Sequence, residues 1–304
     1  MRALVIGYGS IGKRHADLLS NNQEFDGIDV YVLTSQQISS AKRIATLEEI
    51  PDLAPDYVVI ASPTTQHYDQ LRFVDENLTG RLILVEKPLF DREAEFSSEN
   101  NKIFVGYNLR FHPLIQKIKK TIEGRDLWSL HVICASFLPS WRPGRDYRET
   151  SSANKAAGGG VLLDLSHELD YLKWLAGNFS VCSAISGKVS NLEIDSDDIL
   201  LLSGRTERGA YVQVNLNYFS RRPIRRLSID GDGISVQADL IGNTLDIVED
   251  EQESNYSWPD LKRNFSYLQQ HRAILSRDPL TACTLEEGLS TMRIIEDIRL
   301  NHRK

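Results

Sequence analysis

Residues 3–12 read ALVIGYGSIG, four apolar residues followed by three glycines in the spacing GxGxxG. The apolar run is typical of a buried strand, and residues 11–20 after the glycines have the pattern of a helix. Each glycine has a physical reason: Gly7 permits a tight turn, Gly9 lets another group approach the backbone, and Gly12 lets helix and strand pack closely. This stretch therefore predicts the first unit of a doubly wound α/β fold.

The glycine turn also predicts a binding site for the pyrophosphate of a dinucleotide. Unbonded N–H groups at the start of the following helix, together with the helix dipole, favour an anion there. The residues expected to contact it are Gly7, Gly9, Ser10, Ile11 and Gly12.

The residues after the second expected strand, 30–33, bear on which dinucleotide binds. An NAD-selective fold usually places Asp or Glu there to bond the ribose 2′-hydroxyl. This chain has Thr34 and Ser35 instead, with Lys42 and Arg43 a few residues further on as candidates to bind a 2′-phosphate. The sequence therefore favours NADP, with NAD as the alternative.

Two patterns divide the chain near Pro113. Before it, short apolar runs alternate with helical stretches, which is typical of a parallel sheet covered on both faces. We therefore expect residues 1–113 to form a Rossmann domain with a doubly wound parallel sheet. Its expected elements are strands 3–6, 30–33, 57–61, 82–85 and 103–105 and helices 11–20, 66–77 and 92–99.

After residue 113, long strands joined by tight turns predict a largely antiparallel open sheet. Residues 114–304 are thus expected to form an α+β domain for substrate binding and oligomerisation, with a last helix that can pack back on the first domain. Its expected elements are strands 127–138, 181–189, 199–205, 211–218, 224–229, 234–238 and 244–248 and helices 114–123, 161–176, 260–275 and 285–299.

Composition argues against several classes of function. The chain has 304 residues and a net charge of −7, and an acidic surface repels phosphate backbones, so we expect no nucleic-acid partner. No run approaches the roughly 20 apolar residues that cross a bilayer, and the N-terminus lacks a signal-peptide pattern. We expect a cytoplasmic protein without membrane contact. Three separated cysteines without zinc-ligand spacing predict buried free thiols and no metal site.

Five motifs follow one another along the chain: GYGSIGKRH (7–15), ASPTTQH (61–67), EKP (86–88), GYNLRFHP (106–113), and GGG followed by an Asp and HxxD (158–170). Together they resemble the glucose–fructose oxidoreductase / inositol dehydrogenase / MocA family, over nearly the whole chain. The resemblance implies an NAD(P)-dependent oxidoreductase that transfers a hydride between nicotinamide and a secondary hydroxyl or keto carbon. The implied substrate is a sugar, a polyol or a nucleotide-linked sugar.

The resemblance also implies site residues. Beyond the glycine turn, the residues implied to line the cofactor are Thr34, Ser35, Ser62, Pro63, Thr64, His67, Glu86, Lys87 and Asn108. Lys87 and His167 are the implied catalytic pair. The family pattern often has an Asp four residues before the histidine, where this chain has Leu163; Asp164, three before it, is the third catalytic candidate.

These residue types suit the chemistry. An imidazole titrates near neutrality, so His167 is able to accept the hydroxyl proton as the hydride leaves. The ammonium of Lys87 stabilises negative charge on the same oxygen, and Asp164 is placed to orient the imidazole or to bind a neighbouring hydroxyl. In one continuous helix over 161–176, Asp164, His167 and Tyr171 share a face.

The segment 141–148 reads WRPGRDYR, arginines interleaved with aromatic residues. Such a segment binds phosphates or carboxylates, although it equally suits a loop that bridges domains or subunits. The expected substrate-binding residues are Arg110, Trp141, Arg142, Arg145, Tyr147, Asp164 and His167.

Two other functions stay open from the sequence: an NAD-dependent glycosidase that uses transient oxidation, and a dinucleotide-binding redox sensor without turnover. We also expect a homodimer or homotetramer that forms through the C-terminal sheet, since an open sheet otherwise leaves one face uncovered.

Overall fold

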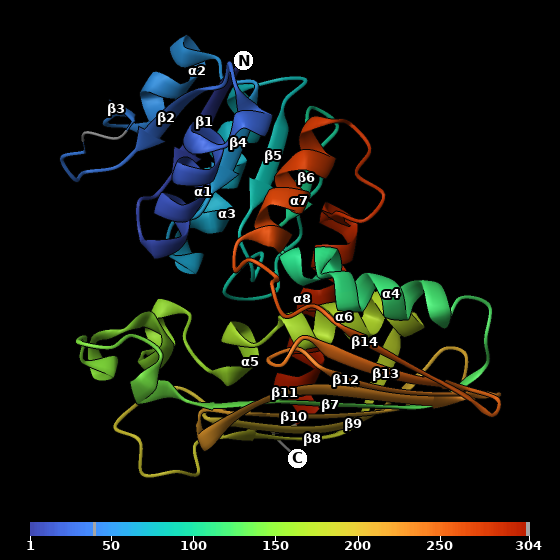
Figure 1. Ribbon diagram of the computed structural model, residues 1–304. Coiled ribbons are helices and arrows are strands. Elements are labelled where there is room, and N and C mark those ends of the chain that lie inside the picture. Colours follow the sequence, from blue (N-terminus) through green and yellow to red (C-terminus); the bar gives the residue numbers. More distant parts are fainter. Residues whose placement is uncertain (39–40, 302–304) are drawn as a thin grey trace. The chain divides into compact units, whose positions relative to one another are not determined.

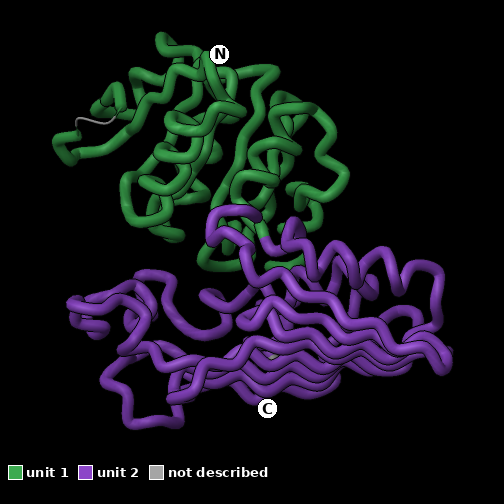
Figure 2. The backbone as a smooth tube through the Cα atoms, in the orientation of Figure 1, with its two compact units in different colours: residues 1–108, 267–292 green, residues 109–266, 293–304 purple. Residues whose placement is uncertain are grey.

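The computed structural model describes residues 1–38 and 41–301. The chain forms two compact units, shown in Figure 2. Unit 1 contains Met1–Asn108 and Tyr267–Met292, and unit 2 contains Leu109–Ser266 and the residues from Arg293. Among the described residues, no helix combines the length and the apolar character that crossing a membrane requires.

Unit 1 is built on a sheet that is parallel except at one edge (Figure 1). In the described part of the chain its strand order is β15-β6-β5-β4-β1-β2-β3. Ala3 to Ile6 of β1 are fully buried, and because consecutive strand residues point to opposite faces, both faces are covered. The elements are β1 (Arg2–Ile6), α1 (Ser10–Asn21), β2 (Asp29–Leu33), β3 (Lys42–Ile44), α2 (Ile50–Leu53), β4 (Tyr57–Ile60), α3 (His67–Asn77), β5 (Leu82–Val85) and β6 (Lys102–Val105).

Residues from near the end of the chain complete unit 1. β15 (Cys283–Thr284) pairs antiparallel with β6, and α7 (Phe265–Leu275) and the first part of α8 (Leu285–Asn301) belong mostly to the same unit. Gly288 of α8 permits close packing, because a Cβ there would lie 2.5 Å from Val105. This segment, apart from the last helix, is expected from the sequence to belong to the second domain, and the structure corrects that expectation.

Unit 2 is built on a sheet whose strands alternate between buried and exposed residues, as in β12, so that one face is covered. Its strand order in the described residues is β14-β13-β12-β11-β7-β10-β9-β8, and Figure 1 shows α4, α5 and α6 over one face. The elements are α4 (Pro113–Thr121), β7 (Leu127–Phe137), α5 (Val161–Asp164), α6 (His167–Ala176), β8 (Phe179–Gly187), β9 (Ile199–Thr206), β10 (Tyr211–Asn217), β11 (Phe219–Gly231), β12 (Ile234–Asp239), β13 (Thr244–Glu249) and β14 (Gln252–Ser257).

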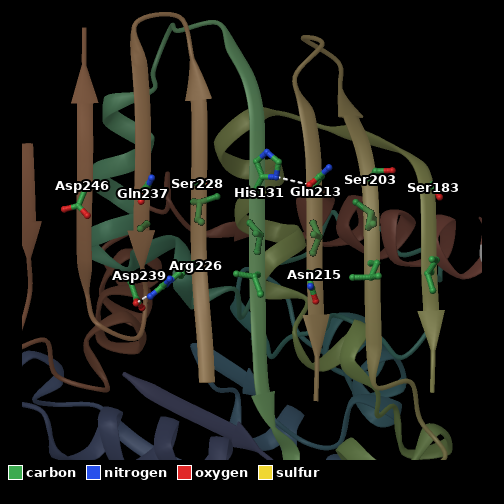
Figure 3. Close-up of a pocket in the computed structure, with 18 of the residues that line it drawn as sticks. His131, Ser183, Ser203, Gln213, Asn215, Arg226, Ser228, Gln237, Asp239 and Asp246 are labelled. Atoms are coloured by element: carbon green, nitrogen blue, oxygen red, sulfur yellow. Dashed lines mark hydrogen bonds and ion pairs between the residues drawn. The ribbon is translucent and has the colours of Figure 1, made fainter. Parts of the chain in front are cut away.

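The other face of this sheet carries a shallow hollow of about 870 Å³. Figure 3 shows its polar side chains standing in rows across the strands, with His131 bonded to Gln213 at 3.0 Å and Arg226 paired with Asp239 at 3.4 Å. Exposed Ile185 adds an apolar group.

The expected fold class is confirmed: a parallel Rossmann sheet and a second, mostly antiparallel sheet. One pair differs, since β7 and β10 run parallel. The short strands β3 and β15 and the polar strand β14, whose sequence is QESNYS, were not expected. Their pairing depends on neighbouring strands, because they lack an apolar pattern of their own.

Two expected helices are corrected. The helix expected over 161–176 is broken at Leu165 and Ser166 into α5 and α6, so Asp164 and His167 do not share the face of one helix. No helix forms over 92–99, where the apolar Ala94 and Phe96 are two residues apart and cannot line one helical face. Phe96 instead packs against the rings of Tyr68 and Phe90.

The expectation that all three thiols are buried is wrong for Cys182. Cys134 and Cys283 are buried, but Cys182 is exposed on β8, the strand at one edge of the unit 2 sheet. An edge strand has a neighbour on one side only, which leaves more of its side chains open to solvent.

Candidate functional site

The glycine turn connects β1 to α1 and has the geometry of an anion cradle. Gly7 has a φ of +94°, and a Cβ on it would lie 2.7 Å from the backbone of Ser62. A Cβ on Gly12 would lie 2.1 Å from the carbonyl oxygen of Gly7. Gly9 differs, because a Cβ there would meet nothing within 4 Å. Two glycines thus serve close packing, while the third leaves open space.

The first turn of α1 faces this open space with its polar backbone. Gly9 is the N-cap residue, no side chain caps the helix, and no acidic residue lies in its first turn. Gly9 and Ser10 are exposed, and Ile11 is half-buried. Helix N–H groups without a capping partner bind phosphate readily. The residues present therefore fit a dinucleotide pyrophosphate.

The carboxyl end of β2 holds one of the two cations that the sequence analysis named. The Nε of Arg43 donates to the carbonyl oxygen of Thr34 at 2.8 Å. Lys42 instead pairs with Asp29 at 2.7 Å, and this lowers the pKa of the Asp29 carboxyl and raises that of the lysine. Asp29 is the first residue of β2, so Lys42 lies at the wrong end for a ribose phosphate. Ser35 is exposed beside Thr34.

The loops after β4 and β5 are tied together by His67, the first residue of α3. Its Nε2 lies 3.0 Å from the Ser62 carbonyl oxygen, and its Nδ1 lies 3.2 Å from those of Pro88 and Leu89. Burial lowers the pKa of this imidazole, partly opposed by these carbonyl contacts. His67 therefore holds these two loops in one arrangement, with Pro63 and Thr64 in the first of them.

Lys87 stands two residues after the end of β5, at the carboxyl edge of the sheet, and its bond to Pro88 is cis. The lysine is half-buried. Its backbone N–H donates to Oε2 of Glu86 at 3.2 Å, while Oε1 of Glu86 lies 3.0 Å from Nε2 of His15. Asn108, just after β6, is buried. The cofactor-lining residues predicted in unit 1 thus follow neighbouring parallel strands, where ligands bind in this fold.

In unit 2, His167 is the first residue of α6 and Asp164 the last residue of α5. The hydroxyl of Tyr218 donates to Oδ2 of Asp164 at 2.5 Å. Burial, and then the charge of Asp164, raise the pKa of this phenol. Tyr218 also contacts Trp141 edge to face, with ring centroids 5.1 Å apart. Sequence reasoning missed Tyr218, since a tyrosine at the end of an alternating strand carries no site signal.

The glycines before α5 let the chain fold tightly around Asp197. Gly160 has a φ of +120°, and a Cβ on it would lie 2.1 Å from Oδ1 of Asp197. Oδ2 of Asp197 accepts from the Leu162 N–H at 2.9 Å, and its carbonyl accepts from that of Val161. Asp197 thereby fixes the start of α5, and sequence reasoning missed it.

Two ion pairs fix α6, one fully buried and one whose arginine is partly exposed. Arg110 bonds both carboxylate oxygens of Asp170, at 2.9 and 2.7 Å, and Arg225 does the same with Glu168, at 2.7 and 3.1 Å. Arg110 was expected to bind substrate, but it is fully buried, which directs it to Asp170. Its position supports a role in holding the helix that begins at His167.

In the loop 141–148, only some of the polar side chains have partners among the residues that the structure describes. Arg148 pairs with Asp146 and with Glu193, and the Tyr147 hydroxyl accepts from the Glu193 N–H at 3.1 Å. Arg142 and Arg145 form no ion pair with any described residue. Of the expected anion-binding residues, these two arginines are the ones without a carboxylate partner in this loop.

Comparisons with known proteins agree with this geometry. Residues 1–101 match the model of an oxidoreductase family with an NAD-binding Rossmann fold, and residues 115–237 match the GFO/IDH/MocA C-terminal domain. Inositol 2-dehydrogenase of Rhizobium meliloti (strain 1021) is 28% identical over 57% of this chain, and the match spans only about half of that relative, 54%. The uncharacterised oxidoreductase YrbE of Bacillus subtilis (strain 168) is 24% identical over 95% of this chain and 91% of its own.

Solved structures share the fold. A levoglucosan dehydrogenase in complex with NADH superposes with a TM-score of 0.86 at 18% identity, covering 100% of this chain and 97% of that one. The WlbA dehydrogenase from Bordetella pertussis, in complex with NADH and UDP-GlcNAcA, gives 0.78 at 20% identity, covering 100% and 96%. Two matched domain models of one family, in the order that the five motifs predicted, show that this chain belongs to the GFO/IDH/MocA family of NAD-binding oxidoreductases.

Proposed function

We propose that the chain is an NAD(P)-dependent dehydrogenase that oxidises a secondary hydroxyl of a sugar, a polyol or a nucleotide-linked sugar, or reduces the corresponding ketone. The observation that carries the proposal is in unit 1. Gly9, with open space beside it, and Lys87, with its side-chain amine, both lie just beyond the carboxyl ends of strands in one parallel sheet. The named relatives support a sugar-like substrate, since they include inositol and levoglucosan dehydrogenases.

The residue roles follow from the chemistry of alcohol oxidation. The nicotinamide of a bound dinucleotide supplies or accepts the hydride. Nδ1 of His167 is buried, so we assign Nε2 as the atom that takes the hydroxyl proton. Lys87 stabilises charge on the substrate oxygen. Asp164, held by Tyr218, binds a neighbouring hydroxyl or orients the imidazole.

Two substitutions test these roles. Removing a positioned acid–base group costs about 10²–10⁴-fold in rate, so we expect Lys87→Met and His167→Asn to lose turnover by that factor. Both should still bind reduced dinucleotide, measured by its fluorescence. The substrates to try are polyols, aldoses and nucleotide sugars with both cofactors, followed by the absorbance of reduced nicotinamide. Wild-type rates in both variants would overturn the assignment, and release of free sugar without net reduction would favour the glycosidase.

We propose NADP as the preferred cofactor, because Arg43 borders the end of β2 where no acid stands. Wild-type protein should bind NADPH more tightly than NADH. Losing a charge-assisted contact costs about 10–100-fold in affinity, so Arg43→Met should weaken NADPH binding by that factor and leave NADH binding unchanged. Lys42→Met is the matched control, since Lys42 pairs with Asp29. Tighter NADH binding by the wild type would refute the preference.

The uncovered face of the unit 2 sheet is proposed to pair with a second copy of the chain in a homodimer or homotetramer. Its hollow is lined mostly by polar side chains, including the paired Arg226 and Asp239 (Figure 3). The exposed Ile185 and Leu201 add apolar groups. Light scattering after size-exclusion chromatography should give an oligomer for the wild type and a smaller species for Leu201→Arg. Leu280→Arg is the control, because Leu280 is 90% exposed in unit 1. A monomeric wild type would refute the pairing.

A further inference from the structure

Three fully buried polar side chains of unit 1 have no part in the mechanism above. They are His15 on α1, Tyr57 at the start of β4 and His271 on α7, each 0% exposed. They come from segments far apart in the sequence and meet beneath the helices α1 and α7. Burying such groups is unfavourable unless each is hydrogen-bonded, so the arrangement of their bonds is informative.

The three side chains form a linear series of hydrogen bonds. The Tyr57 hydroxyl lies 2.9 Å from Nδ1 of His271, Nε2 of His271 lies 2.8 Å from Nδ1 of His15, and Nε2 of His15 lies 3.0 Å from Oε1 of Glu86. Each ring nitrogen has one partner. The series ends at the carboxylate whose other oxygen accepts the N–H of Lys87.

Only one direction satisfies every group when Glu86 is ionised. The carboxylate accepts from Nε2–H of His15, so a neutral His15 presents Nδ1 as an acceptor. His271 must then donate from Nε2, and its Nδ1 accepts from the Tyr57 hydroxyl. Both imidazoles are therefore neutral and carry their proton on Nε2.

The opposite direction leaves a proton without an acceptor. If His271 donated from Nδ1, the Tyr57 phenol would accept that bond, and its own proton would be buried without a described partner. A charged His15 leads to the same result, since it would donate to His271 as well as to Glu86. Burial, and then His15, also hold the pKa of His271 well below its usual value.

The carboxylate of Glu86 is confined from a further side. A Cβ on Gly106 would lie 2.8 Å from its Oε1, so the glycine leaves space for the carboxylate and no more. Its two oxygens bond His15 and the backbone of Lys87. Any rotation of the Glu86 side chain would therefore disturb its bond to the backbone N–H of Lys87.

We propose that Tyr57, His271, His15 and Glu86 form a positioning relay that holds the backbone of Lys87 in its working place. These are positioning residues that act through Glu86, not groups that touch substrate. The inference rests on the proposed function in one respect, the catalytic role of Lys87. In this proposal α7 helps to position Lys87 through His271, although His271 lies more than 180 residues after Lys87 in the chain.

Nitrogen NMR of the full chain labelled with ¹⁵N-histidine tests the relay without any substrate. The signals of His15 and His271, assigned from His15→Gln and His271→Gln, should show neutral Nε2–H tautomers at about pH 7. Tyr57→Phe should shift the Nδ1 signal of His271. An imidazolium, or an Nδ1–H tautomer at either residue, would overturn the proposal.

Glu86→Gln tests positioning by kinetics. The amide is nearly isosteric but has a single oxygen, so it must release either His15 or the Lys87 N–H. Small misplacement of a catalytic group costs up to about 100-fold. We expect kcat to fall about 10–100-fold, with the KM for the dinucleotide little changed. His15→Leu should show the same fall, and His15→Gln, which keeps a donor and an acceptor, should recover most of it.

Asp75→Asn is the matched control. Asp75 is another buried carboxylate of unit 1, bonded to Ser98 at 2.5 Å and to Asn101 at 2.7 Å. This variant should lower Tm without lowering kcat. An equal fall in kcat for Asp75→Asn, or wild-type kcat in Glu86→Gln, would overturn the positioning role. If the wild type oxidises no substrate, the proposed function fails, and the NMR spectra alone decide whether the relay exists.

Discussion

The two units satisfy their buried polar groups in different ways. Unit 1 uses neutral groups in series, such as Tyr57, His271 and His15, whereas unit 2 uses bidentate ion pairs such as that of Arg110 with Asp170. Deleting one member of a neutral series leaves an unsatisfied dipole, but deleting one member of a buried ion pair leaves an uncompensated charge. We therefore expect unit 2 to lose more stability than unit 1 when a single buried polar residue is replaced.

The largest effect is expected for Arg110→Met. It leaves the Asp170 carboxylate buried without its partner, which should lower the free energy of unfolding by about 3–5 kcal/mol. Tryptophan fluorescence in a urea titration measures this in unit 2, because all four tryptophans, Trp128, Trp141, Trp174 and Trp258, lie there. Replacing both partners, Arg110→Met with Asp170→Leu, should restore most of the loss. A single variant as stable as the wild type would erase the contrast between the units.

Unit 2 also contains a buried neutral imidazole, and acidification should destabilise the unit by protonating it. This makes the difference between the two units less sharp. Burial lowers the pKa of His112 from 6.5 to about 4, while its Nδ1 caps α4 by accepting the Leu114 N–H. Because the folded pKa is the lower one, the stabilisation is complete above pH 6.5 and is lost as the pH falls toward about 4. The loss should reach about 3 kcal/mol, taking about 1.4 kcal/mol per pKa unit.

His112→Asn tests this, because asparagine also caps a helix but does not titrate. The measurement is urea unfolding followed by tryptophan fluorescence at pH 7 and at about pH 4.5. The wild type should lose more stability between these two pH values than the variant. Equal losses would show that His112 is not the group responsible.

A smaller effect is expected for Tyr57→Phe in unit 1. It removes one hydroxyl and leaves Nδ1 of His271 as a buried acceptor, at a cost of about 1–3 kcal/mol. Hydrogen exchange of peptides from α1 and α7, read by mass spectrometry, should show faster opening. A loss as large as that of Arg110→Met would mean that the neutral series is no more tolerant than the ion pair.

The smallest effect is expected for Arg148→Met. Its partners Asp146 and Glu193 form an ion-pair cluster of the same chemistry as Arg110 with Asp170, but at the surface, where water screens the charges. Unfolding monitored by tryptophan fluorescence should not differ measurably from the wild type. A clear loss would show that pairing itself, rather than burial, makes unit 2 sensitive.

The local parts of the fold could be predicted from the sequence. Buried strands such as β1 and β4 are continuous apolar runs, and the turn at Gly7 has a spacing that sterics demand. β14 could not be predicted in this way, since its polar sequence pairs only because β13 offers an edge. Likewise, the start of α5 is fixed by the contacts of Asp197, a residue more than 30 positions away.

The same limit applies to the candidate site. Lys87 and the glycine turn carry motifs, so their places were predictable, although their roles stay predictions. Tyr218 carries none, and its place depends on the bond to Asp164. Arg110 lies within a motif, yet its burial against Asp170 could not be inferred, because a motif does not state which way a side chain points.

The contribution of residues 267–292 to unit 1 has a consequence for biosynthesis. A nascent chain that has emerged through Asn108 carries the glycine turn but lacks β15, which covers the edge of β6, and His271. Unit 2, in contrast, has most of its residues as soon as Ser266 leaves the ribosome. Domains generally fold as units during synthesis, so the region made first waits until residues 267–292 have been made before its folding can be completed.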